Sequence, residues 1–366
     1  MTPIHAHMPV EVIRKEGALS ECGRYAAEFG KRCLILTGGH SAQKNGALQA
    51  ALASMQAAGV EAIVFPHISA NPTIAQCRNA SDAADAGKVH SILAIGGGSV
   101  MDAAKATAWM TENFLLDPEK LFRGELKRPP LPLMVCGTTA GTGSEVTNVA
   151  VITDDQGVKR SVKHPSCFAR VAFCDPRYTD ACPREVTVST ALDALCHAAE
   201  GYLNPSCDPL STLYAERALP LIAAELHRLC AQDLPDRDGR DRLLDGSLLA
   251  GLVLGACGTA FPHPMGYVLT ERFDIPHGRA TAAFLPALLD CAIEATPTRA
   301  EAFFALVGGE ARLRETLGIL NGFSLKMSED DLAHCAERFD RLPHFARVPG
   351  GFDGVRAAAL CRTLFG

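Results

Sequence analysis

The run SILAIGGGSVMDAAKATAWM occupies residues 91–110 and decides the fold of the first half of the chain. Its first part is a short apolar run typical of a buried strand. Three glycines and then a helical stretch follow. A strand that ends in glycines and opens a helix lets backbone N–H groups approach a phosphate, and the helix N-terminus adds partial positive charge. The run is therefore either a phosphate-binding loop or a plain strand-to-helix connection, and it matches neither G-x-G-x-x-G nor the P-loop pattern.

The same alternation of apolar strands and Ala-rich helices continues on both sides of this run. Such a rhythm predicts an α/β fold with a parallel sheet covered by helices. A β-hairpin is also expected over 149–164, because a turn signal at 155–157 separates its two halves. The other predicted strands are 33–39, 60–66, 91–98 and 132–139, and the predicted helices include 41–59 and 73–87.

The pattern changes after residue 176. Residues 183–330 show helical periodicity, and no strand run stands out among them. We therefore predict an α/β domain over 1–178 and an all-helical domain over 179–366.

Composition and charge exclude several classes of protein. The net charge is −6 and no Lys/Arg run is present, which argues against a nucleic-acid partner. The chain has no apolar stretch of membrane-spanning length, and its first residues lack a secretory pattern, so a cytoplasmic protein without membrane association is expected. Its 14 cysteines are scattered without a C-x-x-C pair, which favours reduced thiols that pack as small hydrophobes.

Two further polar loops suggest a nucleotide. Residues 136–148 hold four Thr, one Ser and three Gly, which suit a loop that hydrogen-bonds a ribose or pyrophosphate, although a Ser/Thr-capped turn remains an alternative. Residues 37–46 follow the first strand of the α/β rhythm and offer Gly38, Gly39 and Ser41 but no acid. An acid there would bind the ribose of NAD, so its absence favours NADP, unless Ser41 only caps a helix.

Asp193 and His197 lie four residues apart in a mostly apolar helix, so their side chains share one face. Alone they could be a hydrogen-bonded core pair. His263, between two prolines, and His277, in an Ile-Pro-His-Gly turn, add two imidazoles. One carboxylate and three imidazoles suit Fe(II) or Zn(II) with an open position for a substrate oxygen.

Four motifs together resemble the iron-containing (group III) alcohol dehydrogenases: GGGSVMDAAK (96–105), TTAGTGSEVT (138–147), DALCHAAEGYL (193–203) and HPMGYVLTERFDIPHG (263–278). The resemblance implies a dehydroquinate synthase-like architecture. In it, a Rossmann-like dinucleotide-binding domain precedes a helical metal-binding domain and the active site lies between them. It also implies a homodimer. The metal ligands carry over as Asp193, His197, His263 and His277, and the coenzyme contacts as Gly97, Gly98, Ser99, Asp102, Thr138, Thr139, Thr142, Thr147 and Lys159.

Two departures from the family pattern matter. Many members have a second histidine four residues after the third ligand, often assigned to proton relay. This chain has Tyr267 there, which is either the relay or a packing residue. The family's usual acid after the first strand is replaced by Gly38, which again favours NADP over NAD.

The resemblance implies an NAD(P)-dependent alcohol dehydrogenase that interconverts a short aldehyde and a primary alcohol. We predict His263 and Tyr267 as its catalytic side chains, with a water chain as the alternative to Tyr267 for the proton relay. The stretch 267–278 is similar to the branch that reduces phosphonoacetaldehyde, and Arg272 and Arg279 either bind an anionic tail or are surface charges. A maleylacetate reductase-like or glycerol dehydrogenase-like enzyme is a further alternative. A nucleotide- or metal-binding protein without catalysis is the rival of another class.

Overall fold

The computed structural model describes residues 4, 6–113, 117–125 and 127–366. The chain divides into two compact units, which we call the α/β unit and the helical unit. The α/β unit comprises residues 7–183 together with 236–244. The helical unit comprises the described part of residues 1–6, residues 184–235 and residues 245–366.

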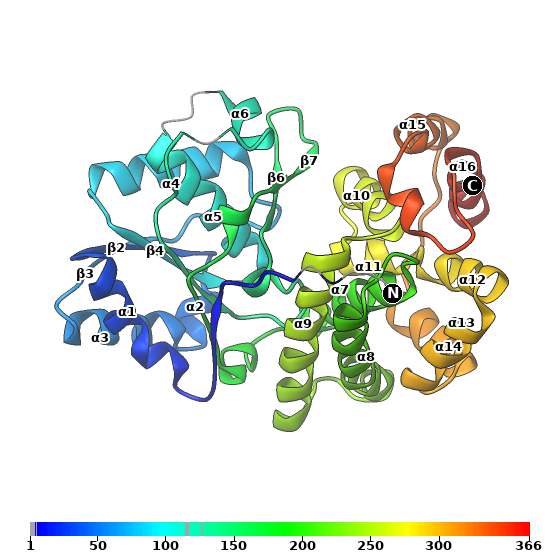
Figure 1. Ribbon diagram of the computed structural model, residues 1–366, viewed down its shortest axis with the longest axis horizontal. Helices are drawn as coiled ribbons and strands as arrows, with labels where there is room; N and C mark the ends of the chain where they lie inside the picture. The colour runs from blue at the N-terminus through cyan, green and yellow to red at the C-terminus, as the bar shows by residue number, and fades with distance from the viewer. Residues whose placement is uncertain (1–3, 5, 114–116, 126) are drawn as a thin grey trace. The chain divides into compact units, whose positions relative to one another are not determined.

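The α/β unit is built on a parallel sheet that holds six strands in the described chain, in the order β1-β8-β5-β4-β2-β3 (Figure 1). The predicted parallel α/β fold is confirmed. Strands β1 and β8 go beyond the predicted ones, because four residues are too few to show a clear period. The sheet strands are β1 Glu11–Arg14, β2 Arg32–Thr37, β3 Glu61–Phe65, β4 Ser91–Gly96, β5 Leu133–Gly137 and β8 Val171–Cys174.

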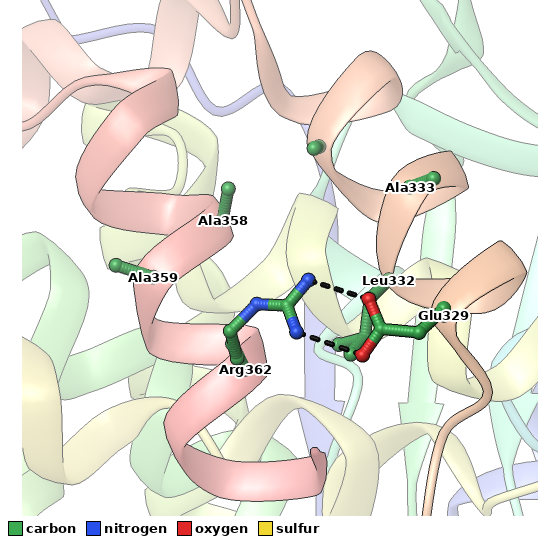
Figure 2. Close-up of a pocket in the computed structure, with 7 residues that line it drawn as sticks. Glu329, Leu332, Ala333, Ala358, Ala359 and Arg362 are labelled. Carbon is green, nitrogen blue, oxygen red and sulfur yellow. Dashed lines mark hydrogen bonds and ion pairs between the residues drawn. The ribbon is translucent and has the colours of Figure 1, made fainter.

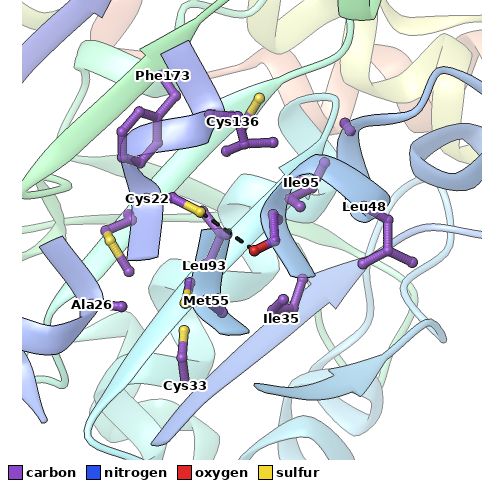
Figure 3. Packing of buried hydrophobic residues seen from close by; sticks show 14 of the residues in the cluster. Cys22, Ala26, Cys33, Ile35, Leu48, Met55, Leu93, Ile95, Cys136 and Phe173 are labelled. Atoms are coloured by element: carbon purple, nitrogen blue, oxygen red, sulfur yellow. Dashed lines mark hydrogen bonds between the residues drawn. The ribbon is translucent and has the colours of Figure 1, made fainter. Parts of the chain in front are cut away.

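Helices cover both faces of this sheet (Figure 1). Helices α1 (Cys22–Phe29) and α3 (Ala47–Ala57) pack on one face, and α4 (Ile74–Ala86) and α5 (Gly98–Asn113) on the other. Alternate strand residues point to opposite faces, as the period of a strand requires. Figure 3 shows the core under α1 and α3, to which the sheet contributes Cys33, Ile35, Leu93, Ile95, Met134, Cys136, Val171 and Phe173.

Cysteines fill this core as small apolar residues, as the sequence predicts. Cys22, Cys33 and Cys136 are fully buried in it, and burial raises the pKa of the Cys33 thiol to about 12. A thiol held neutral at physiological pH is unreactive and behaves like an alkyl group.

The predicted helix 41–59 is wrong in one respect, because the structure breaks it into α2 (Ser41–Lys44) and α3. The break falls at Gly46, whose φ of 80° is a left-handed conformation that glycine adopts without strain. Asn45 stabilises the turn: its Oδ1 accepts from the Ala47 N–H at 3.0 Å and its Nδ2 donates to the Tyr178 carbonyl at 2.8 Å. An internal Asn-Gly pair thus outweighs the helical spacing around it.

The predicted hairpin is present as β6 (Val149–Thr153) paired antiparallel with β7 (Lys159–Lys163). Buried Lys105 of α5 links it to the loop before it. The Lys105 Nζ donates to the Ser144 carbonyl at 2.9 Å, to Ser144 Oγ at 2.7 Å and to the Val149 carbonyl at 2.8 Å. The remaining short elements of the unit are η1 Ala18–Glu21, α6 Pro118–Phe122, η2 Ser144–Val146, η3 Pro165–Cys167 and η4 Pro176–Thr179.

The helical unit surrounds α7 (Arg184–Leu203). Between residues 187 and 203 of that helix only Thr190 is not buried. A helix that is covered on all sides explains why its sequence is apolar all round. The other helices are α8 Pro209–Leu229, α9 Arg237–Cys257 (whose residues up to 244 belong to the α/β unit), α10 Pro262–Phe273, α11 His277–Ala282, α12 Leu285–Ala295, α13 Pro297–Leu306, α14 Glu310–Leu320, α15 Glu329–Phe339, η5 Pro343–Arg347 and α16 Gly354–Phe365.

Among the described helices, none is by itself both long and apolar enough to cross a membrane. The bent pair α9 and α10, which turns by 110°, meets that test by length and composition only.

Candidate metal centre and nucleotide-binding loops

The metal centre begins with one face of the buried helix α7. Asp193, His197 and Glu200 occupy positions i, i+4 and i+7, which lie one above the other on a helix. All three side chains are buried. Three polar groups inside an apolar helix require partners, and these come from α10 and α11.

Two glycines let these helices approach one another closely. A methyl group at Gly278 would lie only 1.7 Å from the Ser189 carbonyl oxygen of α7. A methyl group at Gly266 of α10 would lie 2.9 Å from the Thr281 backbone of α11. Each distance is far inside van der Waals contact, so only glycine permits this packing. As a result, α11 presents its first residue, His277, to α7, while α10 presents His263.

The predicted ligands converge on one oxygen. Oδ1 of Asp193 lies 3.4 Å from Nε2 of His263, 3.6 Å from Nε2 of His277 and 3.9 Å from Nε2 of His197. One ligand atom each from Asp193, His263 and His277 lies within 4.8 Å of the others. The rings of His197 and His263 stack, with centroids 4.4 Å apart. The structure therefore brings Asp193, His263 and His277 together from three helices as a possible metal-binding group, with His197 beside Asp193 and His263.

Glu200 is a residue of the site that the sequence analysis does not single out. Its Oε1 accepts from Nδ1 of His263 at 2.5 Å, and its Oε2 accepts from the Ala260 N–H at 2.7 Å. A carboxylate on the far nitrogen of a metal-binding histidine sets the tautomer and the ring orientation. The i+7 spacing from Asp193 was the signal that could have identified Glu200.

The electrostatics of this cluster favour a cation. Burial by itself would raise the pKa of Asp193, but His197, His277 and His263 outweigh it and lower that pKa. Burial would lower the pKa of His263, yet Glu200 and Asp193 raise it to about 10. Two carboxylates buried among imidazoles thus demand positive charge, which either a proton or a divalent cation can supply.

The donor set fits a metal ion. Among the described residues, neither Oδ1 of Asp193 nor Nε2 of His263 has a hydrogen-bond partner, although both atoms are buried. Buried polar atoms without partners are costly, and both of these point toward the shared centre. Nitrogen and carboxylate donors of this kind suit Fe(II) or Zn(II).

Two more rings adjoin the centre. Tyr267 is half-buried and stacks on His277, with ring centroids 5.3 Å apart. His344 is half-buried, and burial together with the charges of Arg347 and His263 lowers its pKa to about 4. The sequence does not single out His344, because the spacing of His344 from the predicted ligands gives no periodic signal.

The predicted nucleotide loops lie next to one another at the carboxyl ends of the parallel strands. Strands β2, β4 and β5 are neighbours, and their carboxyl ends align, with Thr37 opposite Ile95 and Gly96 opposite Gly137. The chain passes from β2 outward to β3 and then back to β4 on the other side of β2, so the strand order reverses between β2 and β4. Nucleotides bind outside the carboxyl ends of parallel strands at such a reversal.

Glycine–threonine contacts join the two longer loops. A methyl group at Gly98 would lie 2.5 Å from Thr142 Cγ2, and one at Gly97 would lie 3.1 Å from Thr139 Oγ1. The Thr138 N–H donates to the Gly96 carbonyl at 3.0 Å. These contacts hold a hydroxyl-rich loop beside the N-terminus of α5, which is a favourable place for a phosphate.

Other predicted coenzyme residues have local partners. Asp102 accepts from Ser144 Oγ at 2.7 Å and from the Val151 N–H at 2.9 Å, and its pKa is raised by burial despite the charges of Lys105 and Lys159. Asp102 therefore fastens α5 to the loop and the hairpin. Two other predicted coenzyme residues also accept hydrogen bonds within the unit. Thr147 Oγ1 accepts from Lys105 Nζ at 3.4 Å, and Ser99 Oγ accepts from the Asn71 N–H at 3.3 Å.

The loop after β2 is more open. A methyl group at Gly38 would lie 2.9 Å from the Ile68 carbonyl oxygen and 3.3 Å from Val100 Cγ2, so Gly38 packs against the start of α5. Gly39 and Ser41 are exposed, and Ser41 is the first residue of α2.

Helices α15 and α16 line a hollow whose lining includes none of the predicted site residues (Figure 2). Alanines line most of it, and Arg362 forms a two-pronged ion pair with Glu329 at 2.8 and 2.9 Å. Its lining offers no nucleophile or metal ligand set, so we assign it no part in the chemistry.

The sequence matches two family models in the order of its two units. Residues 9–176 match the model described as iron-containing alcohol dehydrogenase, and residues 187–336 match that for the C-terminal part of the Fe-containing alcohol dehydrogenase family. The chain belongs to the iron-containing alcohol dehydrogenase family. The prediction of an oxidoreductase acting on CH–OH groups is thereby confirmed.

Relatives in this family span most of the chain. The chain is 29% identical over 351 residues to long-chain-alcohol dehydrogenase 1 of Geobacillus thermodenitrificans, covering 94% of this chain and 85% of that one. It is 33% identical over 274 residues to the probable alcohol dehydrogenase EutG of Salmonella typhimurium, covering 75% and 69%. A solved iron-containing alcohol dehydrogenase of Thermotoga maritima superposes with a TM-score of 0.92 at 32% identity and 99% coverage of both chains.

The solved sulfoacetaldehyde reductase of Bifidobacterium kashiwanohense, in complex with NAD+, is also similar. It superposes with a TM-score of 0.88 at 25% identity and 98% coverage of both chains. The fold of this chain is therefore similar to that of a reductase of sulfoacetaldehyde, which is an anionic aldehyde.

Replacing Glu200 by Gln should weaken metal binding. Glutamine has one oxygen to serve two donors and carries no charge to orient His263, so the Kd for Zn(II) should rise roughly 10–100-fold. Competition with a chromophoric chelator measures that Kd. Glu294→Gln, an exposed change on α12, is the matched control and should leave it unchanged. Equal affinity of the Glu200→Gln and wild-type proteins would contradict the positioning role.

Proposed function

We propose that this enzyme interconverts a short aldehyde and a primary alcohol by hydride transfer, with NADP(H) preferred over NAD(H). The observation that carries the proposal is the cluster of Asp193 with three imidazole Nε2 atoms, 3.4–3.9 Å from its Oδ1. The intact four-ligand set supports the alcohol dehydrogenase branch over a maleylacetate reductase-like or glycerol dehydrogenase-like enzyme.

Asp193, His197, His263 and His277 would hold the metal, either Fe(II) or Zn(II), since both accept these ligands. When bound, the metal supplies a Lewis acid that polarises the substrate oxygen, and the dinucleotide supplies the hydride. The chain itself must present its ligands in a fixed array. Glu200 does this for His263 and the Gly278 contact does it for His277, so the array needs little reorganisation.

The proton of the alcohol must exchange with solvent during turnover. Tyr267 stacks on His277 and is half-buried, so it adjoins the ligands and also reaches solvent. These contacts support Tyr267 as a relay in the place where relatives carry histidine. Packing against His277 is the other role that the same contact supports.

The coenzyme preference rests on the loop after β2. The ends of β2 and β4 flank the reversal of strand order, and the β2 loop presents Gly39 and Ser41 to solvent without an acid. A carboxylate there would repel a 2′-phosphate, whereas a glycine-rich loop leaves room for one. The similar NAD+ complex of sulfoacetaldehyde reductase supports NAD(H) as the other acceptable coenzyme.

An anionic aldehyde is a second candidate substrate, because the chain is similar to a sulfoacetaldehyde reductase. On the sequence alone, Arg272 and Arg279 are either anion-binding groups or surface charges. Arg272 pairs with Asp331 and Arg279 with Glu185, each at 2.7 Å. Arginines that already hold carboxylates have less to offer a phosphonate or sulfonate, so uncharged aldehydes stay the first candidate.

Replacing His277 by Ala should remove metal and activity together. The loss of one imidazole opens the donor set, and kcat/KM for aldehyde reduction should fall roughly 1,000-fold or more, because the metal supplies several kcal/mol of charge stabilisation. Metal content by mass spectrometry and NADPH oxidation are the two measurements, made on enzyme prepared without oxygen. His334→Ala in the same unit is the control. Full activity in metal-free enzyme would refute the proposed function.

A panel of short aldehydes addresses the substrate. Propanal and lactaldehyde should be reduced with kcat/KM values at least equal to those for phosphonoacetaldehyde and sulfoacetaldehyde, because Arg272 and Arg279 are already paired. A preference for the anionic aldehydes of roughly tenfold or more, about 1.4 kcal/mol, would instead establish the second candidate.

Replacing Ser41 by Asp should shift the coenzyme preference toward NADH. The added carboxylate is exposed at the start of α2, where it repels a 2′-phosphate and can accept from a ribose hydroxyl. The ratio of kcat/KM for NADPH to that for NADH should fall roughly tenfold or more. Gln43→Asp adds the same charge to the same helix and is the control. An unchanged ratio would show that this loop does not contact the adenosine ribose.

A further inference from the structure

Two cysteines that are distant in sequence meet at the edge of the helical unit. Cys207 lies in the turn between α7 and α8, and Cys257 is the last residue of α9. Their Sγ atoms are 3.3 Å apart. Of the 14 cysteines, 11 are buried, and these two are among the three that are partly exposed, the third being Cys230.

The surroundings of Cys207 favour its thiolate. Its sulfur accepts a hydrogen bond from the Cys257 thiol at 3.3 Å, and Thr212 Oγ1 lies 3.6 Å from it, where its proton is shared with the Asp208 carbonyl at 3.0 Å. Arg299 also donates to Thr212 Oγ1, at 3.4 Å, which brings its positive charge near the sulfur. The hydrogen bond from Cys257 is the largest cause that lowers the pKa of Cys207, to about 7, and Thr212 and Arg299 lower it further. Burial and the charge of Asp208 act in the opposite direction.

Cys257 has the opposite character. The same contact with Cys207, together with burial, raises the pKa of the Cys257 thiol. One sulfur is therefore a nucleophile near neutral pH and the other is a protonated neighbour within reach. Redox-responsive cysteine pairs have this asymmetry, with a partly exposed low-pKa thiol beside a resolving one.

The backbone holds the two sulfurs in register. Asn204 Nδ2 donates to the Cys257 carbonyl at 3.3 Å, and Asn204 Oδ1 accepts from the Ser206 N–H at 2.9 Å. The turn that carries Cys207 is thus fastened to the end of α9. The sulfurs at 3.3 Å are farther apart than the roughly 2.05 Å of a disulfide bond, so they must approach by about an ångström to form one.

We propose that Cys207 and Cys257 form a thiol redox site that a hydroperoxide oxidises to a reversible disulfide. The Cys207 thiolate attacks one peroxide oxygen; the O–O bond breaks, the leaving hydroxide takes up a proton to become water, and Cys207 becomes a sulfenic acid. Cys257 then attacks that sulfur, the S–O bond breaks, and a second water leaves with the Cys257 proton. Two thiols lose two electrons and two protons, and hydrogen peroxide is reduced to two waters.

The test uses the full chain loaded with Zn(II), which avoids peroxide chemistry at iron. After exposure to hydrogen peroxide and alkylation of the remaining thiols, peptide mapping should find residues 207 and 257 in one cross-linked pair. That pair should lack the mass of two hydrogen atoms and should separate after treatment with dithiothreitol. A disulfide that joins other cysteines, or oxidation of Cys230 while this pair stays reduced, would overturn the proposal.

Serine variants separate the two roles. Cys257→Ser should accumulate a sulfenic acid on Cys207 that dimedone traps. Cys207→Ser should slow the oxidation of Cys257 roughly tenfold or more, because that thiol stays protonated. Cys230→Ser is the control and should form the disulfide at the wild-type rate. Equal dimedone labelling of Cys257 in Cys207→Ser and of Cys207 in Cys257→Ser would overturn the assignment of the nucleophile.

Discussion

The close approach of three helices at two glycines is the constraint on which the metal centre depends. Gly278 lets α11 touch the backbone of α7, and Gly266 lets α10 touch α11. A side chain at Gly278 would separate α11 from α7 by more than an ångström, and one at Gly266 would separate α10 from α11 by a few tenths of an ångström. Metal coordination tolerates shifts of only a few tenths of an ångström, so backbone packing, rather than the ligands themselves, sets the geometry of the site.

Because α7 is buried, the charged side chains on it need compensating partners from the helices packed against it. A carboxylate in an apolar helix is unfavourable unless a partner compensates it. Asp193 and Glu200 both lie on that helix, and His263 contacts the two of them. The imidazoles lower the pKa of Asp193 while the carboxylates raise that of His263. The buried carboxylates of Asp193 and Glu200 thus require positive charge at this place in the helical unit.

In the α/β unit, glycines likewise allow close packing, here between the N-terminus of α5 and the hydroxyl-rich loop. Gly97 and Gly98 leave room for the threonines of the neighbouring loop. Lys105 and Asp102 of α5 both form hydrogen bonds with Ser144 of that loop. The hydroxyl-rich segment 138–147 therefore has a fixed backbone beside a helix N-terminus. These local hydrogen bonds fix the loop beside the N-terminus of α5, which is a favourable position for an anionic ligand.

The sequence by itself determined the βα rhythm, the hairpin, the helical second half and the family, because local periodicity or short motifs encode each of them. It also singled out the four residues proposed as metal ligands. It did not reveal the break at Gly46, the short strands β1 and β8, Glu200 beside His263, or the meeting of Cys207 with Cys257. Only the tertiary structure decided these. They depend on contacts between segments distant along the chain, or on local turn chemistry that competes with periodicity, and such contacts leave no regular spacing in the sequence.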